Sequence, residues 1–135
     1  MHTLKLARTL VNQMLTQAQE SPDTEICGLL GGRNNRAQHC YPISNQAQQP
    51  QRHYLMDPQQ QIEAMRQMRE AGDELVAIYH SHPTAAAIPS DTDLKEAQYP
   101  DAAYLIISLN TEGVLELAAF RIRQGQASQL QLELE

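Results

Sequence analysis

The chain has 135 residues, of which 41% are hydrophobic, and its formal net charge is −6. This composition is that of a globular protein, and the length suits a single domain, residues 1–135, with a buried core. Only 10 lysines and arginines are scattered along the chain, which argues against nucleic-acid binding. No apolar run reaches membrane-spanning length and the first residues lack the apolar stretch of a signal peptide, so a cytoplasmic location is expected.

The first part of the chain predicts a helix followed by two strands. Apolar residues recur at helical spacing within the first 20 residues, at Ala7, Leu10, Val11, Met14, Leu15 and Ala18. A helix that binds a partner has the same pattern, but a helix facing the core is far commoner. Residues 21–23 end this helix. Residues 26–31 and 37–44 predict two buried strands with a turn between them, and the polar residues 45–51 predict a mobile loop.

A second helix is marked by its capping residues. A short strand is expected at residues 54–56, and Asp57 as N-cap with Pro58 in the first helical position predicts a helix start. Gly72 ends this helix. Three apolar side chains are expected to face the core, at Ile62, Met65 and Met68.

The rest of the chain alternates strands with one more helix. In chain order the pattern predicts a strand at 75–79, a helix at 90–97, a strand at 104–109, a turn at 110–113, a strand at 114–122 and a last strand around 130–134. This order predicts an α+β (mixed α/β) domain, with helices packed against a largely antiparallel sheet. Cys27 and Cys40 belong to no C-x-x-C pair, so both are expected to be reduced, structural cysteines.

Three candidate metal ligands gather in the stretch IYHSHPTAAAIPSDTD, residues 78–93. His80 and His82 end a predicted strand, and residues i and i+2 of a strand point to the same face. Pro83 favours extended geometry at His82. Asp93 adds a carboxylate. Two imidazoles and one carboxylate leave a fourth position for water, which is the pattern of a catalytic zinc ion.

Plainer explanations exist for each part of this stretch. A lone H-x-H pair is more often a surface or hydrogen-bonded pair of histidines. Ser90 and Asp93 match the capping box S/T-x-x-D/E, which many helices carry for structural reasons alone. His2, His39 and His53 fit no ligand spacing.

The combination of motifs resembles the JAMM (MPN+) metalloprotease family. The run H-x-H-P, seven residues from Pro83 to Pro89, and S-x-x-D match its metal motif. The segment EICGLLG, residues 25–31, matches its upstream E-x-C-G-x-L-x-G. The resemblance spans most of the chain and implies the JAMM/MPN fold, a cytidine-deaminase-like sheet flanked by helices.

The resemblance also implies a role for each motif residue. His80, His82 and Asp93 would bind Zn²⁺, Glu25 would act as general base on the attacking water, and Ser90 would donate a hydrogen bond to the oxyanion. Without the resemblance, Glu25 reads as a solvated or salt-bridged glutamate before a strand. Gly28, Gly31 and Gly32 would allow close approach of the backbone near the site, although a bulge or hairpin turn explains them more simply.

The family acts on ubiquitin-like chains or on small sulfur-carrier proteins. This short chain has little room for the insertions with which larger members grip ubiquitin, and it resembles the small prokaryotic members. Some of these remove a C-terminal residue, such as cysteine, from a sulfur carrier. The expected partner is therefore a ubiquitin-like or sulfur-carrier protein with a Gly-Gly tail, whose glycines let an extended strand enter a narrow groove.

Two other functions compete with the peptidase. The first is a non-catalytic MPN-type interaction module, although such modules have typically lost metal ligands and every motif position is filled here. The second is another zinc hydrolase, or a metal-binding protein, on the same fold, since a fold does not fix a function. The RadC-like branch shares H-x-H-P and S-x-x-D but fits the residues between His82 and Ser90 less well.

Overall fold

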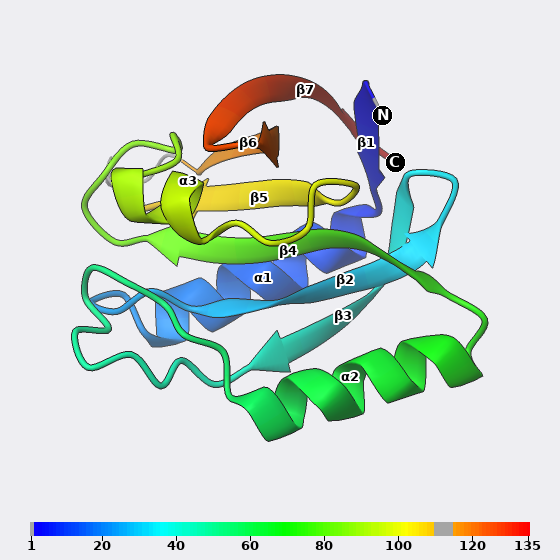
Figure 1. Cartoon of the computed structure of the whole chain (residues 1–135), viewed down its shortest axis with the longest axis horizontal. Helices are drawn as coiled ribbons and strands as arrows, with labels where there is room; N and C mark the ends of the chain where they lie inside the picture. The colour runs from blue at the N-terminus through cyan, green and yellow to red at the C-terminus, as the bar shows by residue number, and fades with distance from the viewer. Residues whose placement is uncertain (1, 110–114) are drawn as a thin grey trace.

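A curved sheet of seven strands and three helices make up the part of the chain described by the computed structural model, residues 2–109 and 115–135 (Figure 1). In chain order the elements are β1 (Thr3–Leu6), α1 (Arg8–Glu20), β2 (Cys27–Arg33), β3 (Arg36–Ile43), α2 (Pro58–Glu70), β4 (Glu74–His82), α3 (Asp91–Glu96), β5 (Ala103–Ser108), β6 (Glu116–Arg123) and β7 (Gln126–Leu134). The turn expected at residues 110–113 lies outside the described residues.

The sheet closes on itself in the order β1-β3-β2-β4-β5-β6-β7, with β7 also paired to β1. Within the described residues four pairings are antiparallel and three are parallel, namely β1–β3, β1–β7 and β4–β5. The sheet is therefore mixed, and the expectation of a largely antiparallel sheet is corrected on this point. The α+β class itself is confirmed.

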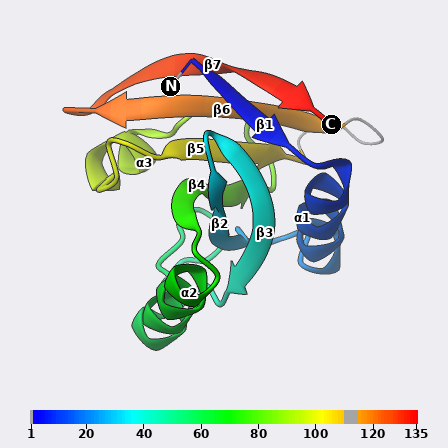
Figure 2. The ribbon, with the colours of Figure 1, turned by 90° about the vertical axis from the view of Figure 1, so that its right-hand side faces the viewer.

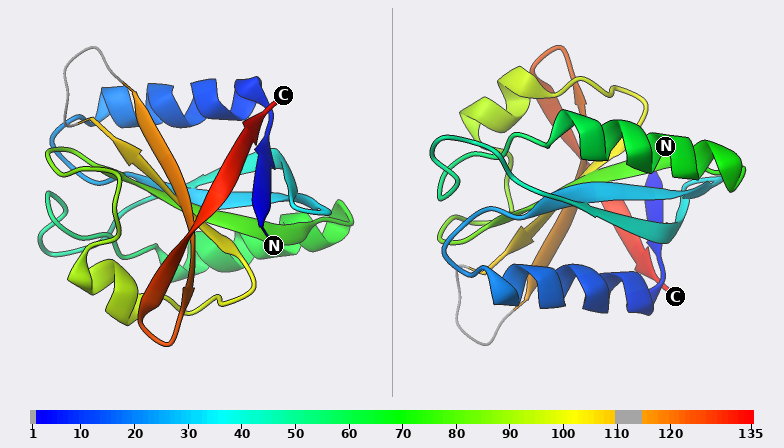
Figure 3. Two further views of the ribbon diagram at one scale, coloured as in Figure 1. Left: turned by 90° about the horizontal axis from the view of Figure 1, so that it is seen from above. Right: turned by 90° about the horizontal axis from the view of Figure 1, so that it is seen from below.

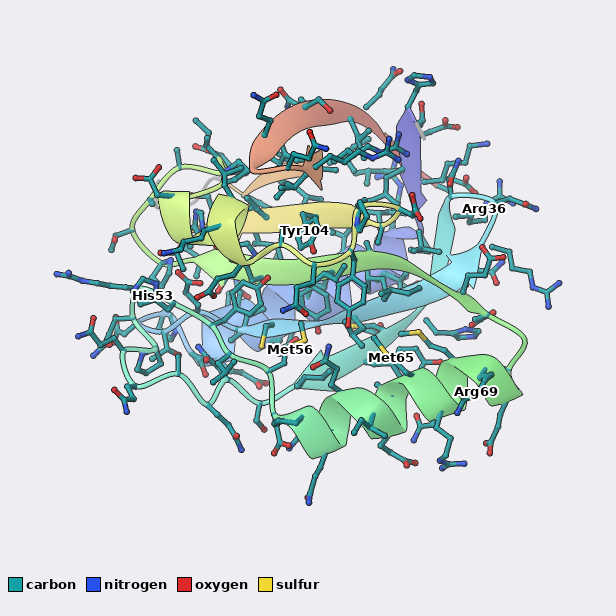
Figure 4. The ribbon with its side chains drawn as sticks, in the orientation of Figure 1. Arg36, His53, Met56, Met65, Arg69 and Tyr104 are labelled. Carbon is teal, nitrogen blue, oxygen red and sulfur yellow. The ribbon has the colours of Figure 1, made fainter. Side chains whose placement is uncertain are left out.

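Helices α1 and α2 cover opposite faces of β2, β3 and β4 (Figures 2 and 3). Each helix packs on its own apolar layer. On the α1 side the layer includes Leu4, Leu6, Leu10, Met14, Leu30, Tyr79 and Leu105. On the α2 side it includes Cys27, Leu29, Met56, Met68, Ile78, Tyr104 and Ile106. Figure 4 shows Met56 and Met65 in the space between α2 and the sheet.

Three sequence predictions differ from the observed elements. Residues 3–6 form strand β1, because Leu4 and Leu6 alternate with half-exposed neighbours and are completely buried, so the first helix begins only at Arg8. Residues 54–56 form no strand; a single bridge joins Met56 to Asn45. Ile62 does not face the core, since its side chain is 70% exposed.

The predictions that depend on capping and chain reversal hold. Asp57 caps α2 by accepting hydrogen bonds from the backbone N–H groups of Gln59 and Gln60, and Pro58 is the first helical residue. Gly72 follows the helix with a φ of 75°, a conformation that favours glycine. Both cysteines are free thiols. Among the described helices, none combines the length and apolar character needed to cross a membrane.

Strand β4 carries the site because it lies in the middle of the sheet, between β2 and β5. Its residues from Val76 to His82 are all buried. The end of β4, the start of β2, helix α3 and the loop between β3 and α2 gather at the same end of the molecule, on the left in Figure 1. Motif residues that are distant in the sequence therefore meet there.

Candidate metal centre

The two histidines of the H-x-H-P motif end strand β4 and point to the same face, as the alternation of a strand requires. Both are buried, with 1% of His80 and 4% of His82 exposed. Their Nε2 atoms are 3.1 Å apart. The sequence prediction that the two imidazoles converge is confirmed.

Asp93 reaches the same point from helix α3. Its Oδ2 atom lies 3.1 Å from Nε2 of His80 and 3.1 Å from Nε2 of His82. The backbone N–H of Ser90 donates to this same oxygen at 2.9 Å, and the N–H of Asp93 donates to Ser90 Oγ at 3.0 Å. The capping box and the metal-ligand geometry are thus one arrangement, in which the helix start orients the carboxylate towards the histidines.

Glu25 joins this group from the segment before β2. Its neighbour Ile26 is tied to β4 twice, because the Ile26 N–H donates to Ser81 Oγ at 2.9 Å and the Ser81 N–H donates to the Ile26 carbonyl at 3.0 Å. Ser81 is completely buried between the two histidines in sequence. One ligand atom from each of four side chains lies within 4.8 Å of the others, from Glu25, His80, His82 and Asp93.

The three closest atoms fit a tetrahedral metal ion. Around Zn²⁺ with bonds of about 2.0–2.1 Å, the corners of a tetrahedron are about 3.3–3.4 Å apart. The three observed separations are each 3.1 Å. Oε1 of Glu25 is buried without a hydrogen-bond partner in the described structure. A buried carboxylate oxygen in this state needs a donor, and a metal-bound water beside the three ligands would supply one.

The charges of the group favour a cation. Burial acts to raise the pKa of Asp93, but hydrogen bonds from His80 and His82 outweigh it and hold this pKa well below its usual range. Burial lowers the pKa of His80, so its imidazole is neutral and able to ligate. Burial also acts to lower the pKa of His82, yet hydrogen bonds with Asp93 and the Ala86 carbonyl raise it overall.

Glu25 has the protonation behaviour of a general base. Burial raises its pKa from 4.5 to about 7, although the charge of His82 opposes this shift. A group whose pKa lies near the working pH can accept a proton in one step and donate it in the next.

Further contacts orient His80 and His82, and sequence reasoning missed the residues that make them. His82 Nδ1 lies 2.8 Å from the Ala86 carbonyl, and the Ser108 hydroxyl donates to the Ala85 carbonyl at 2.6 Å, which fastens the loop after His82. The ring of Tyr54 stacks on His80 with a centroid distance of 4.5 Å. A partner on the second imidazole nitrogen sets the tautomer of a ligand histidine. No sequence pattern indicated these partners, because they lie in loops and neighbouring strands.

The chain is similar to known proteins in both sequence and structure. The family model of prokaryotic homologs of the JAB domain matches residues 7–123. A desampylase of Haloferax volcanii is 35% identical over 111 residues, which cover 78% of this chain and 80% of that protein. The CysO-cysteine peptidase of Mycobacterium tuberculosis is 34% identical over 130 residues, or 95% of this chain and 88% of that protein. The solution structure of a Desulfitobacterium hafniense protein superimposes with a TM-score of 0.87 and 33% identity, covering 98% and 92% of the two chains.

Proposed function

Because the chain belongs to the family of prokaryotic homologs of the JAB domain, we propose that it is a zinc-dependent peptidase, with residues 1–135 acting as one catalytic domain. It hydrolyses a peptide or isopeptide bond at the C-terminal tail of a ubiquitin-like or sulfur-carrier protein. The observation that carries the proposal is the convergence of Glu25, His80, His82 and Asp93 within 4.8 Å.

In this proposal His80, His82 and Asp93 hold Zn²⁺. When bound, the ion supplies a water with a pKa near ~7 and polarises the scissile carbonyl. Glu25 accepts a hydrogen bond from the attacking water, takes its proton and returns it to the leaving amine. The raised pKa of Glu25, about 7, suits both transfers.

Ser90 stabilises the oxyanion in this proposal. Its Oγ accepts the N–H of Asp93, which leaves the hydroxyl hydrogen free of that contact and able to donate to the substrate. The same atom therefore fixes the helix start as an acceptor and acts on the substrate as a donor. No covalent intermediate forms with the chain.

The substrate class is supported by the known relatives, which include a desampylase and a CysO-cysteine peptidase. An extended Gly-Gly tail would place its carbonyl beside Glu25 without steric conflict from side chains. The conjugated amine, whether a lysine or a further C-terminal residue, would leave with the proton that Glu25 returns to it.

The test is an assay of the purified protein against a panel of Gly-Gly carriers, some with a C-terminal extension and some joined to lysine, with and without chelator. Wild-type protein should bind one zinc per chain and lose activity with chelator. Glu25→Gln should keep the zinc and lose roughly 10²–10⁴-fold in rate. Glu20→Gln, at an exposed position of α1, serves as the control.

Two results would contradict this function. Persistent hydrolysis by Glu25→Gln would show that the base is another group. Tight binding of a carrier with zinc present but without hydrolysis would favour the non-catalytic interaction module.

A further inference from the structure

The side chain of Asn45 uses its full hydrogen-bonding capacity at the start of the loop between β3 and α2. Its Nδ2 donates to the carbonyl of Glu25 at 2.9 Å and to the carbonyl of His53 at 2.9 Å. Its Oδ1 accepts from the N–H of Leu55 at 2.9 Å and from the N–H of Ala47 at 3.0 Å. An amide has two N–H donors and an oxygen with two lone pairs, so these four bonds satisfy it completely.

On one side this amide fixes the backbone of Glu25. The ladder between β2 and β4 begins only at Cys27, and the double link through Ser81 ends at Ile26. The main chain of Glu25 is held by the loop instead, because its N–H donates to the Pro50 carbonyl at 2.7 Å and its carbonyl accepts from Asn45. Oε1 of Glu25 is buried without a partner, so the direction of the carboxylate depends on this backbone.

On the other side the same amide fixes Tyr54. It binds the carbonyl of His53 and the N–H of Leu55, the residues immediately before and after Tyr54. The ring of Tyr54 stacks on the imidazole of His80 with a centroid distance of 4.5 Å and an interplanar angle of 26°. Asn45 therefore reaches both the general base and one metal ligand, each through a single intervening residue or peptide group.

We propose that Asn45 is a positioning residue that holds Glu25 and the Tyr54–His80 stack in register across the metal centre. The inference rests on the function proposed above. It replaces the expectation of a mobile loop at residues 45–51 with a segment anchored at its first residue. An ordinary structural asparagine would stabilise the fold without acting through Glu25.

The test compares Asn45→Asp and Asn45→Ala with Gln46→Ala in the zinc-loaded protein. Asn45→Asp keeps an oxygen for the N–H groups of Leu55 and Ala47 but turns a second oxygen towards two carbonyls. Gln46→Ala removes a neighbouring amide that binds Asp57 and does not contact Glu25. We expect both Asn45 variants to lower kcat by roughly 10–100-fold, the range of partners that orient active-site groups. KM should change by less than about 2-fold, and Gln46→Ala should be near wild type.

A double-mutant cycle separates positioning from general stabilisation. In the Glu25→Gln background, Asn45→Asp should lower the residual rate by clearly less than it does in the wild-type background, because one of the two groups that it positions is already gone. A full and additive loss in that background would overturn the inference. So would a wild-type kcat in both Asn45 variants. A failure of Glu25→Gln to slow the reaction contradicts the proposed function instead, so the two failures are distinguishable.

Amide hydrogen exchange provides a readout that needs no substrate. The Glu25 amide should exchange faster in both Asn45 variants, whereas the Leu55 amide should exchange faster in Asn45→Ala and stay protected in Asn45→Asp. Unchanged protection of Glu25 in both variants would overturn the inference even if the protein hydrolysed none of the carriers.

Discussion

The two halves of the metal centre are built in different ways. The ligand half, residues 80–93, is a short continuous stretch whose contacts are mostly local: His82 to the Ala86 carbonyl, and Asp93 to the N–H of Ser90. The base half is Glu25 alone, which lies in the segment just before β2. It is held by contacts to the loop at Asn45 and Pro50 and, through Ile26, to Ser81.

This difference separates metal binding from proton transfer. The ligand half is built from a strand end, one loop and the first turn of α3. The base half needs the register between β2 and β4, in which Cys27 is opposite His80. We therefore expect replacement of His80, His82 or Asp93 to remove the metal, and changes around the base half to spare the metal and slow the reaction.

The largest effect is expected from breaking the ligand half. His82→Ala removes one of three ligands, so zinc should be lost and hydrolysis should fall by at least roughly 10³-fold, equivalent to several kcal/mol of lost stabilisation. Elemental analysis and the carrier assay measure both quantities. His2→Ala, at an exposed position, is the control. Retention of one zinc per chain in His82→Ala would contradict the ligand assignment.

Ser90→Ala tests a residue of the ligand half that does not bind the metal. If its hydroxyl donates to the oxyanion, turnover should fall by roughly 10²–10³-fold while zinc stays bound. The substitution also removes a helix cap, which costs about 1 kcal/mol. Asp57→Ala, which removes the cap of α2, controls for that loss. Equal activity losses in Ser90→Ala and Asp57→Ala would show that Ser90 acts only as a helix cap and not on the oxyanion.

The base half gives a pH dependence of stability in the metal-free protein. Burial raises the pKa of Glu25 from 4.5 to about 7. The folded protein therefore favours the protonated form of Glu25. The contribution of this group to the free energy of unfolding is fully present below its unfolded pKa of 4.5, and it is lost as pH rises through about 7. Metal-free Glu25→Gln should be more stable than metal-free wild type above this range, by up to about 3 kcal/mol.

Denaturant unfolding with chelator, at a pH below 4.5 and at one above 7, measures the difference. The difference in the free energy of unfolding between Glu25→Gln and wild type should be small at the lower pH and larger at the higher one. Glu20→Gln should show no such divergence. A gap that is independent of pH would show that Glu25 does not titrate as a buried acid.

The smallest effect is expected at the link between the halves. Ser81→Ala removes the acceptor of the Ile26 N–H and leaves this buried donor unpaired, at a cost of about 1–2 kcal/mol. Zinc should remain at one per chain while kcat falls, because Glu25 shifts and the ligands do not. Thermal unfolding and the carrier assay measure these changes, with Ser128→Ala on the exposed part of β7 as control. Loss of zinc in Ser81→Ala would show that the halves are not separable.

Sequence reasoning was effective where the physics is local. The alternation of a strand placed His80 and His82 on one face, and capping chemistry located the starts of α2 and α3. The approach of Glu25 could be expected only from the family resemblance, because its position depends on pairing across 55 residues. Ile62 was wrongly expected in the core, since a helix pattern fixes the spacing of apolar residues and not which turn the sheet covers.

The close approach of the Tyr79 ring to Gly28 is a second contact that sequence reasoning could not predict. A Cβ on this residue would lie 2.3 Å from the hydroxyl of Tyr79, so any side chain here would displace that ring. Tyr79 in turn donates to Gln17 of α1 at 2.7 Å. The need for glycine therefore comes from a contact with a neighbouring strand, and the motif alone could not distinguish it from a bulge. The observed bulge lies at Gly31 and Gly32.

The antiparallel ladder that places Cys27 opposite His80 also makes the complete site depend on the pairing of β2 with β4. In the function proposed above, the stretch 80–93 carries all three side chains that would bind the metal. The glutamate arrives only when β2 and β4 have joined. We therefore expect hydrolysis to need the joined β2 and β4, which bring the base to the other three side chains.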